Sequence, residues 1–273
     1  MLKEMLENVR KNIPLVHNIT NYVTVNDCAN ILLACGGSPI MADDIDDAVD
    51  ITAICGGLNI NIGTLNNLII PAILAAGKKA NELSHPVVLD PVGAGASKLR
   101  TETAKKLLND VKFSVIKGNI SEIKTLALGN GTTKGVDADI ADAVTDETLP
   151  EVLKLAKSFA KSTGAVIAIT GAIDIITDGN KAAAIKNGVP MMSKITGTGC
   201  MLSALTVAYV VANSNNVFDA VVAAVCSMGL CGEIAYKRMN INDGNSSFRN
   251  YLIDAMYNLD GDTLEEGAKY EMC

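Results

Sequence analysis

Residues 195–213 read ITGTGCMLSALTVAYVVAN, a glycine-rich turn that runs into a long apolar segment. Residues 201–211 carry no charge and predict a buried helix, because eleven residues are too few to span a bilayer. Gly197 and Gly199 let successive backbone N–H groups point into one space, to which the helix adds its unpaired first-turn N–H groups and the positive end of its dipole. Such a place favours an anion, phosphate first, although a tight turn without a ligand would need the same glycines.

Cys200 stands at the start of this predicted helix and is the candidate base or nucleophile. A helix N-terminus stabilises negative charge, so we expect the pKa of this thiol to be lowered. A covalent thiol mechanism would also need a partner base. The two histidines of the chain, His17 and His85, form no recognisable Cys/His arrangement with it.

The composition limits the class of protein. With 273 residues, of which 49% are hydrophobic and 19% charged, the chain is more apolar than a soluble monomer needs, which predicts a homo-oligomer. A net charge of −7, 4% aromatic residues and no Trp argue against nucleic-acid binding. Residues 1–14 mix charges with apolar positions and predict neither a signal peptide nor a membrane span, so we expect a cytoplasmic protein with no membrane partner.

Strand and helix patterns alternate along the chain and predict one α/β domain over residues 1–273, with a mainly parallel central sheet and helices on both faces. The expected strands are 15–19, 39–41, 51–55, 87–89, 113–116 and 166–169, with a small antiparallel hairpin formed by 173–177 and 181–186. The expected helices are 2–11, 21–35, a short helix opened by the aspartates of 43–47, 65–83, 101–108, one ending at 128, 147–162, 201–211, 217–237 and 247–259.

Polar residues follow several of these strands. They are Asp90, the segment 117–122 (KGNISE), Thr170 and the glycine-rich turn. In open parallel sheets ligands bind beyond the carboxyl ends of the strands, so these residues are expected to meet at one edge of the sheet.

Five segments, taken together, resemble the hydroxyethylthiazole kinases, a family of the ribokinase-like superfamily. The segments are HNITNYVTVNDCANILLACGGSPIMA (17–42), VLDPVGAGAS (88–97), IKGNISEI (116–123), ITGAIDIITDG (169–179) and KITGTGCMLSAL (194–205). The resemblance covers almost the whole chain and depends on the order and spacing of the motifs. It implies a ribokinase-like kinase domain that uses ATP to phosphorylate the primary alcohol of 4-methyl-5-(2-hydroxyethyl)thiazole for thiamine biosynthesis or salvage. It also implies a homotrimer with active sites between subunits.

The groups that phosphoryl transfer requires can also be assigned to residues of the chain from their chemistry, in addition to this resemblance. The anion turn, Gly197, Thr198 and Gly199, would hold the transferring phosphoryl group. Asp90 and Glu122, the latter in an Asn-x-x-Glu pattern that resembles that of ribokinase-like kinases, would hold Mg²⁺ directly or through water. Without the family, Asp90 could equally be a helix or turn cap and Glu122 a solvated first-turn carboxylate.

The resemblance also implies the substrate-binding residues. Lys117 and Thr170 match nucleotide-binding positions, and Met41, Gly197 and Asn21 match or adjoin the thiazole pocket. Lys117 stands where the family usually has Arg. It keeps the positive charge but lacks the planar guanidinium that can donate two parallel hydrogen bonds. Without the resemblance, the Thr170 hydroxyl could simply form a hydrogen bond with a backbone group at the end of a strand, and Met41 could be a core residue.

Cys200 stands where the wider superfamily has a catalytic Asp, and thiazole kinases resemble this chain in carrying Cys. Two other activities remain open on the sequence alone. One is a kinase of the same superfamily that acts on another small heterocyclic alcohol, such as a pyrimidine. The other is a NAD(P)H-hydrate dehydratase on a related fold, which would use an acidic base and a dinucleotide substrate.

Overall fold

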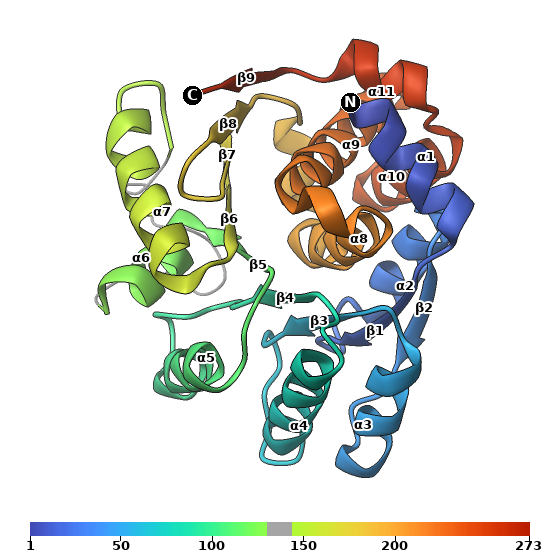
Figure 1. Ribbon diagram of the computed structural model, residues 1–273. Coiled ribbons are helices and arrows are strands. Elements are labelled where there is room, and N and C mark those ends of the chain that lie inside the picture. Colours follow the sequence, from blue (N-terminus) through green and yellow to red (C-terminus); the bar gives the residue numbers. More distant parts are fainter. Residues whose placement is uncertain (130–143) are drawn as a thin grey trace.

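The computed structural model describes residues 1–129 and 144–273, which form a layered α/β structure (Figure 1). Among these residues, nine strands form one sheet in the order β2-β1-β3-β4-β5-β6-β7-β8-β9. The strands are β1 (Leu15–Ile19), β2 (Ser38–Met41), β3 (Gly57–Asn61), β4 (Val87–Asp90), β5 (Val115–Asn119), β6 (Val166–Thr170), β7 (Asp174–Thr177), β8 (Ala182–Ile185) and β9 (Tyr270–Met272). Strands β1 to β6 pair in parallel and β6 to β9 pair antiparallel, which confirms the predicted parallel sheet and hairpin.

Helices cover both faces of the sheet, as predicted (Figure 1). One side carries α1 (Leu2–Asn12), α2 (Val25–Cys35), α8 (Thr198–Ala212), α9 (Val217–Arg238), α10 (Asn245–Asn258) and α11 (Gly261–Gly267). The other carries α3 (Ile45–Ile54), α4 (Ile69–Glu82), α5 (Lys98–Asp110), α6 (Ile120–Leu128) and α7 (Leu149–Thr163). The apolar core is correspondingly divided into two clusters, one on each side of the sheet.

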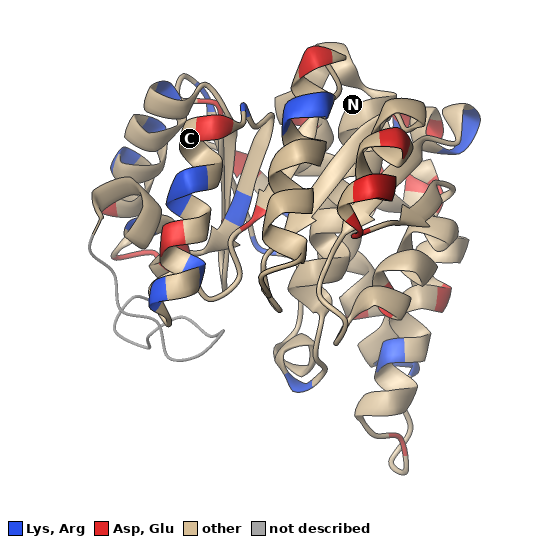
Figure 2. Ribbon diagram, turned by 90° about the horizontal axis from the view of Figure 1, so that it is seen from below, with Lys and Arg blue, Asp and Glu red and all other residues tan. Residues whose placement is uncertain are grey.

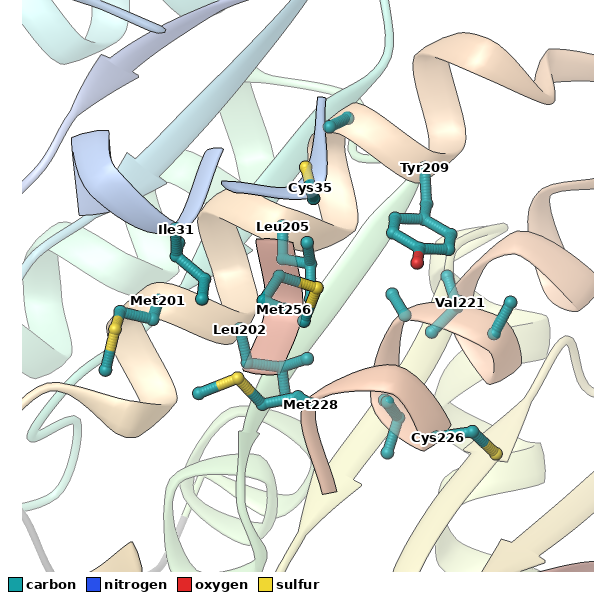
Figure 3. Packing of buried hydrophobic residues seen from close by; sticks show 14 of the residues in the cluster. Ile31, Cys35, Met201, Leu202, Leu205, Tyr209, Val221, Cys226, Met228 and Met256 are labelled. Carbon is teal, nitrogen blue, oxygen red and sulfur yellow. The ribbon is translucent and has the colours of Figure 1, made fainter. Parts of the chain in front are cut away.

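Helix α8 lies at the centre of its layer. It packs on β1, β3 and β4 and against α1, α2 and α9, and every residue from Met201 to Val210 is buried (Figure 3). Glycine at position 57 of β3 permits this contact, because a Cβ atom there would lie 2.5 Å from Val211 and 2.8 Å from Val207. The buried helix predicted from the sequence is therefore present, and it begins at Thr198 rather than at Met201.

Helix α9 is the other long apolar helix. Together with the 3₁₀ turn before it, Ser214–Arg238 has the length and apolar composition to cross a membrane, but 83% of its apolar window is buried inside the protein. Charged residues lie mostly on the outer helices, where Lys and Arg are scattered among Asp and Glu (Figure 2). This distribution is the one expected for core helices surrounded by solvated ones.

The predicted strand 51–55 is wrong, because most of these residues form the end of α3 and the strand lies at Gly57–Asn61. Asp44 begins the helix by accepting a hydrogen bond from Asp46 N at 3.0 Å. Thr52 Oγ1 donates to Ala48 O one turn earlier, which a helix satisfies and a strand would not. A short apolar run fits both the helical period and the strand period, and here the cap at Asp44 favours the helix.

Other element boundaries also differ from prediction. Helix α2 begins at Val25 rather than at Asn21, because Asn21 Oδ1 accepts from Thr24 N at 3.1 Å and so forms a turn before the helix. Ser97, not Thr101, caps α5. Strand β5 extends to Asn119, so Lys117 lies within the strand. Helix α11 and strand β9 were not predicted.

Candidate active site

Predicted site residues are distributed in strand order along the carboxyl edge of the parallel sheet. Met41 ends β2, Asn21 follows β1, Asp90 ends β4, Lys117 lies in β5 and Thr170 ends β6. Parallel strands bring their carboxyl ends to one edge, so the topology alone places these residues on the same side of the molecule. Helix α8 starts at this edge, where its first turn contacts side chains from β3 and β5.

Asp90 is the centre of a buried polar cluster. Its Oδ2 atom accepts hydrogen bonds from Asn61 Nδ2 at 2.9 Å, Lys117 Nζ at 3.1 Å and Ser203 Oγ at 2.6 Å. Within the described residues all hydrogen bonds of this carboxylate end on Oδ2, which leaves Oδ1 for a ligand. Asp90 does not cap the following helix, since Ser97 does. Three convergent donors supply the hydrogen bonds that a buried carboxylate requires.

Lys117 joins this carboxylate to the glycine-rich turn. Its Nζ atom donates to Asp90 Oδ2 and, at 3.0 Å, to Gly199 O. Burial opposes the charge of the Lys117 ammonium, but Asp90, Cys200 and Glu122 together outweigh it and raise its pKa. The ammonium therefore stays charged, and two of its three N–H groups are engaged within the protein.

Cys200 lies on the first turn of α8, where two side-chain amides point at its sulfur. Asn21 Nδ2 donates to Sγ at 3.2 Å and Asn61 Nδ2 at 3.3 Å. Burial and then the charge of Asp90 raise the pKa of the Cys200 thiol, although Lys117 acts in the opposite direction. The expectation of a lowered pKa is thus wrong, because desolvation and a nearby carboxylate outweigh the helix terminus.

Within the part of the chain that the structure describes, the anion turn presents N–H groups without a helical acceptor, and a side chain does not fit at Gly197. The first intrahelical bond of α8 runs from Met201 N to Gly197 O at 2.8 Å, so the N–H groups of Thr198, Gly199 and Cys200 precede it and have no helical acceptor. Gly197 has a φ angle of 93°, and a Cβ atom there would lie 2.7 Å from Thr24. Glycine at 197 is therefore required by the backbone as well as available for a ligand.

Glu122 is buried at the start of α6 rather than solvated. Its Oε1 accepts from Gly93 N and its Oε2 from Asn119 N, both at 2.8 Å, and Asn119 Oδ1 accepts from Glu122 N in return. Burial and the nearby charge of Asp90 raise its pKa to about 7. Thr170 lies beside this turn and donates to Gly118 O at 3.5 Å.

Asp90 and Glu122 form a donor set that suits magnesium. The described residues contain no group of three or more His, Cys, Asp or Glu side chains that could enclose a metal. Mg²⁺ does not need one, since it is usually held by one or two carboxylates, waters and substrate phosphates. The oxygens of Glu122 already accept backbone N–H groups, so Glu122 would reach the ion through water, while Asp90 Oδ1 could bind it directly. A cation here would also relieve the repulsion that raises the pKa of Glu122.

Sequence reasoning found most of this cluster and missed two members. Asn61 and Ser203 are buried and both donate to Asp90, yet Asn61 lies outside the five family-like segments, and Ser203, inside the segment 194–205, was assigned no role. The one available signal for Asn61 was a polar residue at the end of the alternating segment LNIN, and the misplaced strand at 51–55 concealed it. Met41 is partly buried and packs against the apolar cluster that contains α8, which agrees with its alternative reading as a core residue.

Comparisons with known proteins identify the family of the chain. The family model described as "Hydroxyethylthiazole kinase family" matches residues 6–262. Hydroxyethylthiazole kinase from Clostridium acetobutylicum is 67% identical over 271 residues, which cover 99% of each chain. The solved structure of a hydroxyethylthiazole kinase protein from Pyrococcus horikoshii superposes with a TM-score of 0.88 at 34% identity, covering 100% of this chain and 98% of that one.

A more distant solved structure agrees in fold alone. A ribokinase-like superfamily protein from Enterococcus faecalis has a TM-score of 0.64 at 11% identity, covering 93% of each chain. The ribokinase-like fold is thereby confirmed. With the family model spanning nearly all of the sequence and a relative at 67% identity over its full length, the chain belongs to the hydroxyethylthiazole kinase family, whose members are phosphotransferases.

Proposed function

We propose that this protein transfers the γ-phosphoryl group of ATP to the primary alcohol of 4-methyl-5-(2-hydroxyethyl)thiazole, giving the thiazole phosphate used in thiamine biosynthesis. The observation that carries the proposal is the cluster in which Lys117 links Asp90 to Gly199, directly beside Cys200. A carboxylate, a cation, a free helix N-terminus and a thiol thus meet at one point. These are the groups that an in-line phosphoryl transfer to an alcohol requires.

Strand order supports an assignment of the two substrates to opposite ends of the site. Lys117 and Thr170, on β5 and β6, lie on the side proposed for the nucleotide. Asn21 and Met41, after β1 and at the end of β2, lie on the side proposed for the thiazole. The anion turn lies between them, where the γ-phosphoryl group would meet the alcohol.

The chain's own groups can position the nucleotide phosphates. The N–H groups of Thr198, Gly199 and Cys200 would bind the transferring phosphoryl oxygens, and the third N–H of Lys117 would contact the phosphate chain. Asp90 and Glu122 would hold Mg²⁺, which when bound neutralises charge on the phosphate oxygens.

Cys200 is proposed to assist the acceptor alcohol. The alcohol oxygen forms the new P–O bond while the bond from the γ-phosphorus to ADP breaks, and the hydroxyl proton passes to the Cys200 thiolate. A raised thiol pKa makes that thiolate a stronger base and a less populated one. In a loose transition state the proton leaves late, so weak assistance with good alignment is sufficient.

We also propose a cytoplasmic homotrimer with active sites between subunits, and exposed apolar side chains beside the site support the contact between subunits. Tyr22 and Val23 directly follow Asn21 and are 78% and 56% exposed. Exposed apolar groups of this size, next to residues proposed to contact substrate, are typical of surfaces covered by another subunit.

An assay of ADP release across candidate alcohols tests the function. The purified protein, with ATP and Mg²⁺, is offered the thiazole alcohol, a hydroxymethylpyrimidine, pyridoxal and hydrated NADH. We expect the highest kcat/KM with the thiazole alcohol and a product heavier by one phosphoryl group in mass spectrometry. A higher value with the pyrimidine would assign another heterocycle kinase, and ATP-dependent dehydration of hydrated NADH would assign the dehydratase.

A further inference from the structure

Asn61 occupies a position in the site to which neither the sequence motifs nor the proposed mechanism gives a role. It is the last residue of β3, lies opposite Asp90 in the pairing of β3 with β4, and is buried. We infer that Asn61 is a positioning residue that acts through Cys200, with its side-chain N–H group holding the sulfur in place beside Asp90. The inference rests on the proposed function of Cys200 and adds the group that orients it.

The orientation of the Asn61 amide is determined by its neighbours. Its Oδ1 atom accepts from Gly63 N at 2.9 Å, and a backbone N–H can only donate. Its Nδ2 atom donates to Asp90 Oδ2 at 2.9 Å, and a charged carboxylate can only accept. Exchanging the oxygen and nitrogen of the amide would break both contacts, so the N–H group must face Cys200 Sγ, 3.3 Å away.

Asn61 also controls the second donor to the sulfur. Asn21 Nδ2 donates both to Cys200 Sγ at 3.2 Å and to Asn61 Oδ1 at 3.0 Å. One amide therefore supplies a donor to the sulfur and fixes the other donor. Glycine at position 63 leaves room for this arrangement, because a Cβ atom there would lie 3.0 Å from Asn61 Oδ1. Cys200 is thus held at a fixed place relative to Asp90, as a base must be to meet a substrate hydroxyl.

The substitution Asn61→Asp separates positioning from simple structural support. The new side chain keeps an oxygen for Gly63 N and Asn21 Nδ2, and replaces only the NH₂ group that faces Asp90 and Cys200. Loss of the N–H donor and the added negative charge both disfavour the thiolate, so alkylation of Cys200 should slow by about tenfold. A merely loosened structure would expose the sulfur and make alkylation faster, which is a change of opposite sign.

The experiment uses the full chain and iodoacetamide at one fixed pH, with tandem mass spectrometry to assign the label to Cys200. Asn59→Asp is the matched control, because Asn59 is buried two residues earlier on the same strand and donates to Asn18 Oδ1. We expect slower alkylation in Asn61→Asp and an unchanged rate in Asn59→Asp. An unchanged or faster rate in folded Asn61→Asp overturns the inference. If thermal melts show that this variant is unfolded, Asn61→Ala replaces it. Slower alkylation of Cys200 is again required, because the cavity left by the missing side chain would by itself expose the sulfur and make alkylation faster.

A double-mutant cycle then connects the effect to catalysis. Asn61→Asp should lower kcat with little change in the KM for ATP, and it should have a much smaller effect in a Cys200→Ser background, because residues acting as a unit are not additive. Additive effects on kcat would contradict action through Cys200. If the unmodified protein does not phosphorylate the thiazole alcohol, the proposed function fails, and the alkylation rates still decide the inference about Asn61.

Discussion

Lys117 combines a proposed contact with the nucleotide and an observed structural role that the sequence did not predict. The motif predicted a contact with nucleotide phosphate, and the structure adds an ion pair with Asp90 and a bond to Gly199 O. These contacts depend on the pairing of β4 with β5 and on the place where α8 begins, which are properties of the folded chain. The same holds for Asn61 and Ser203, whose roles follow from register and helix packing and not from any local pattern.

Lys117→Ala should therefore affect stability as well as ATP binding. Removing the cation leaves Asp90 buried with one partner fewer, which typically lowers the free energy of unfolding by about 3–5 kcal/mol. The KM for ATP should rise by the equivalent of one charged hydrogen bond, about 1.5–3 kcal/mol. Denaturant unfolding and steady-state kinetics measure the two effects. An ATP KM and a kcat that both equal the wild-type values would remove Lys117 from the nucleotide site.

Cys200 is expected to assist catalysis without being indispensable. Cys200→Ser should slow turnover by about 10²- to 10⁴-fold, the usual contribution of a general base, and leave measurable activity. Cys200→Asp places a carboxylate at the same position and should retain substantial activity. Measurement of kcat for both variants checks this, with binding of the thiazole alcohol as the control. A phosphorylated Cys200 detected by mass during turnover would instead show that the residue is a covalent nucleophile.

At the scale of elements, the sequence predicted the fold well where the hydrophobic period of a segment and its length indicated the same type of element. The parallel strands β1, β4 and β6 and the hairpin β7–β8 were placed to within a few residues. The exception was α3, whose apolar end was read as a strand because only the cap at Asp44 distinguishes the two. Helix α11 and strand β9 were missed because their short sequences gain their structure from tertiary contacts, α11 against α1 and α9, and β9 against β8.

Glu233 of α9 connects this helix to the loop after β8 and to the residue that precedes β9. Its Oε1 accepts from Asn187 Nδ2 at 3.1 Å and Gly188 N at 3.0 Å, and its Oε2 accepts from Lys269 Nζ at 2.6 Å. Burial raises the pKa of Glu233, but these hydrogen bonds and the charge of Lys269 outweigh burial and lower it. A lowered folded-state pKa contributes stability above the pKa of the unfolded chain, and that stability disappears as pH falls through the folded-state value.

Glu233→Gln should accordingly lower the free energy of unfolding by about 1–3 kcal/mol at pH 7, since charged hydrogen bonds are lost. The difference from wild type should shrink as the pH is lowered below that of an ordinary glutamate. Urea unfolding at neutral and acidic pH measures this dependence, with Glu266→Gln on the exposed surface of α11 as the control. A difference that is the same at both pH values would contradict a role for the charge of Glu233.

For the whole molecule, the apolar composition and the exposed apolar side chains both support the proposed association of subunits. The apolar excess of the sequence is matched by exposed side chains that include Leu68 and Ile241 as well as Tyr22 and Val23. Light scattering after gel filtration should therefore give three times the 28.5 kDa mass of one chain. Val23→Asp, beside the proposed thiazole site, should lower both this mass and the activity, because a charge would be buried between subunits.

Leu83→Asp is the control for this test, since Leu83 precedes β4 and lies toward the opposite edge of the sheet. It should retain the trimer mass. A monomeric wild-type protein with full activity would contradict active sites shared between subunits.

The burial of α8 on all sides has a consequence for how this enzyme can change over generations. Met201 to Val210 are part of the core, so a substitution there alters the stability of the molecule and the position of the anion turn together. The loops after β1 and β2 carry exposed residues, among them Tyr22, Val23 and Asp43, that are not part of the core. Adaptation to a new acceptor alcohol is therefore expected to proceed through those loops, with the helix kept as the inherited and least variable part of the chain.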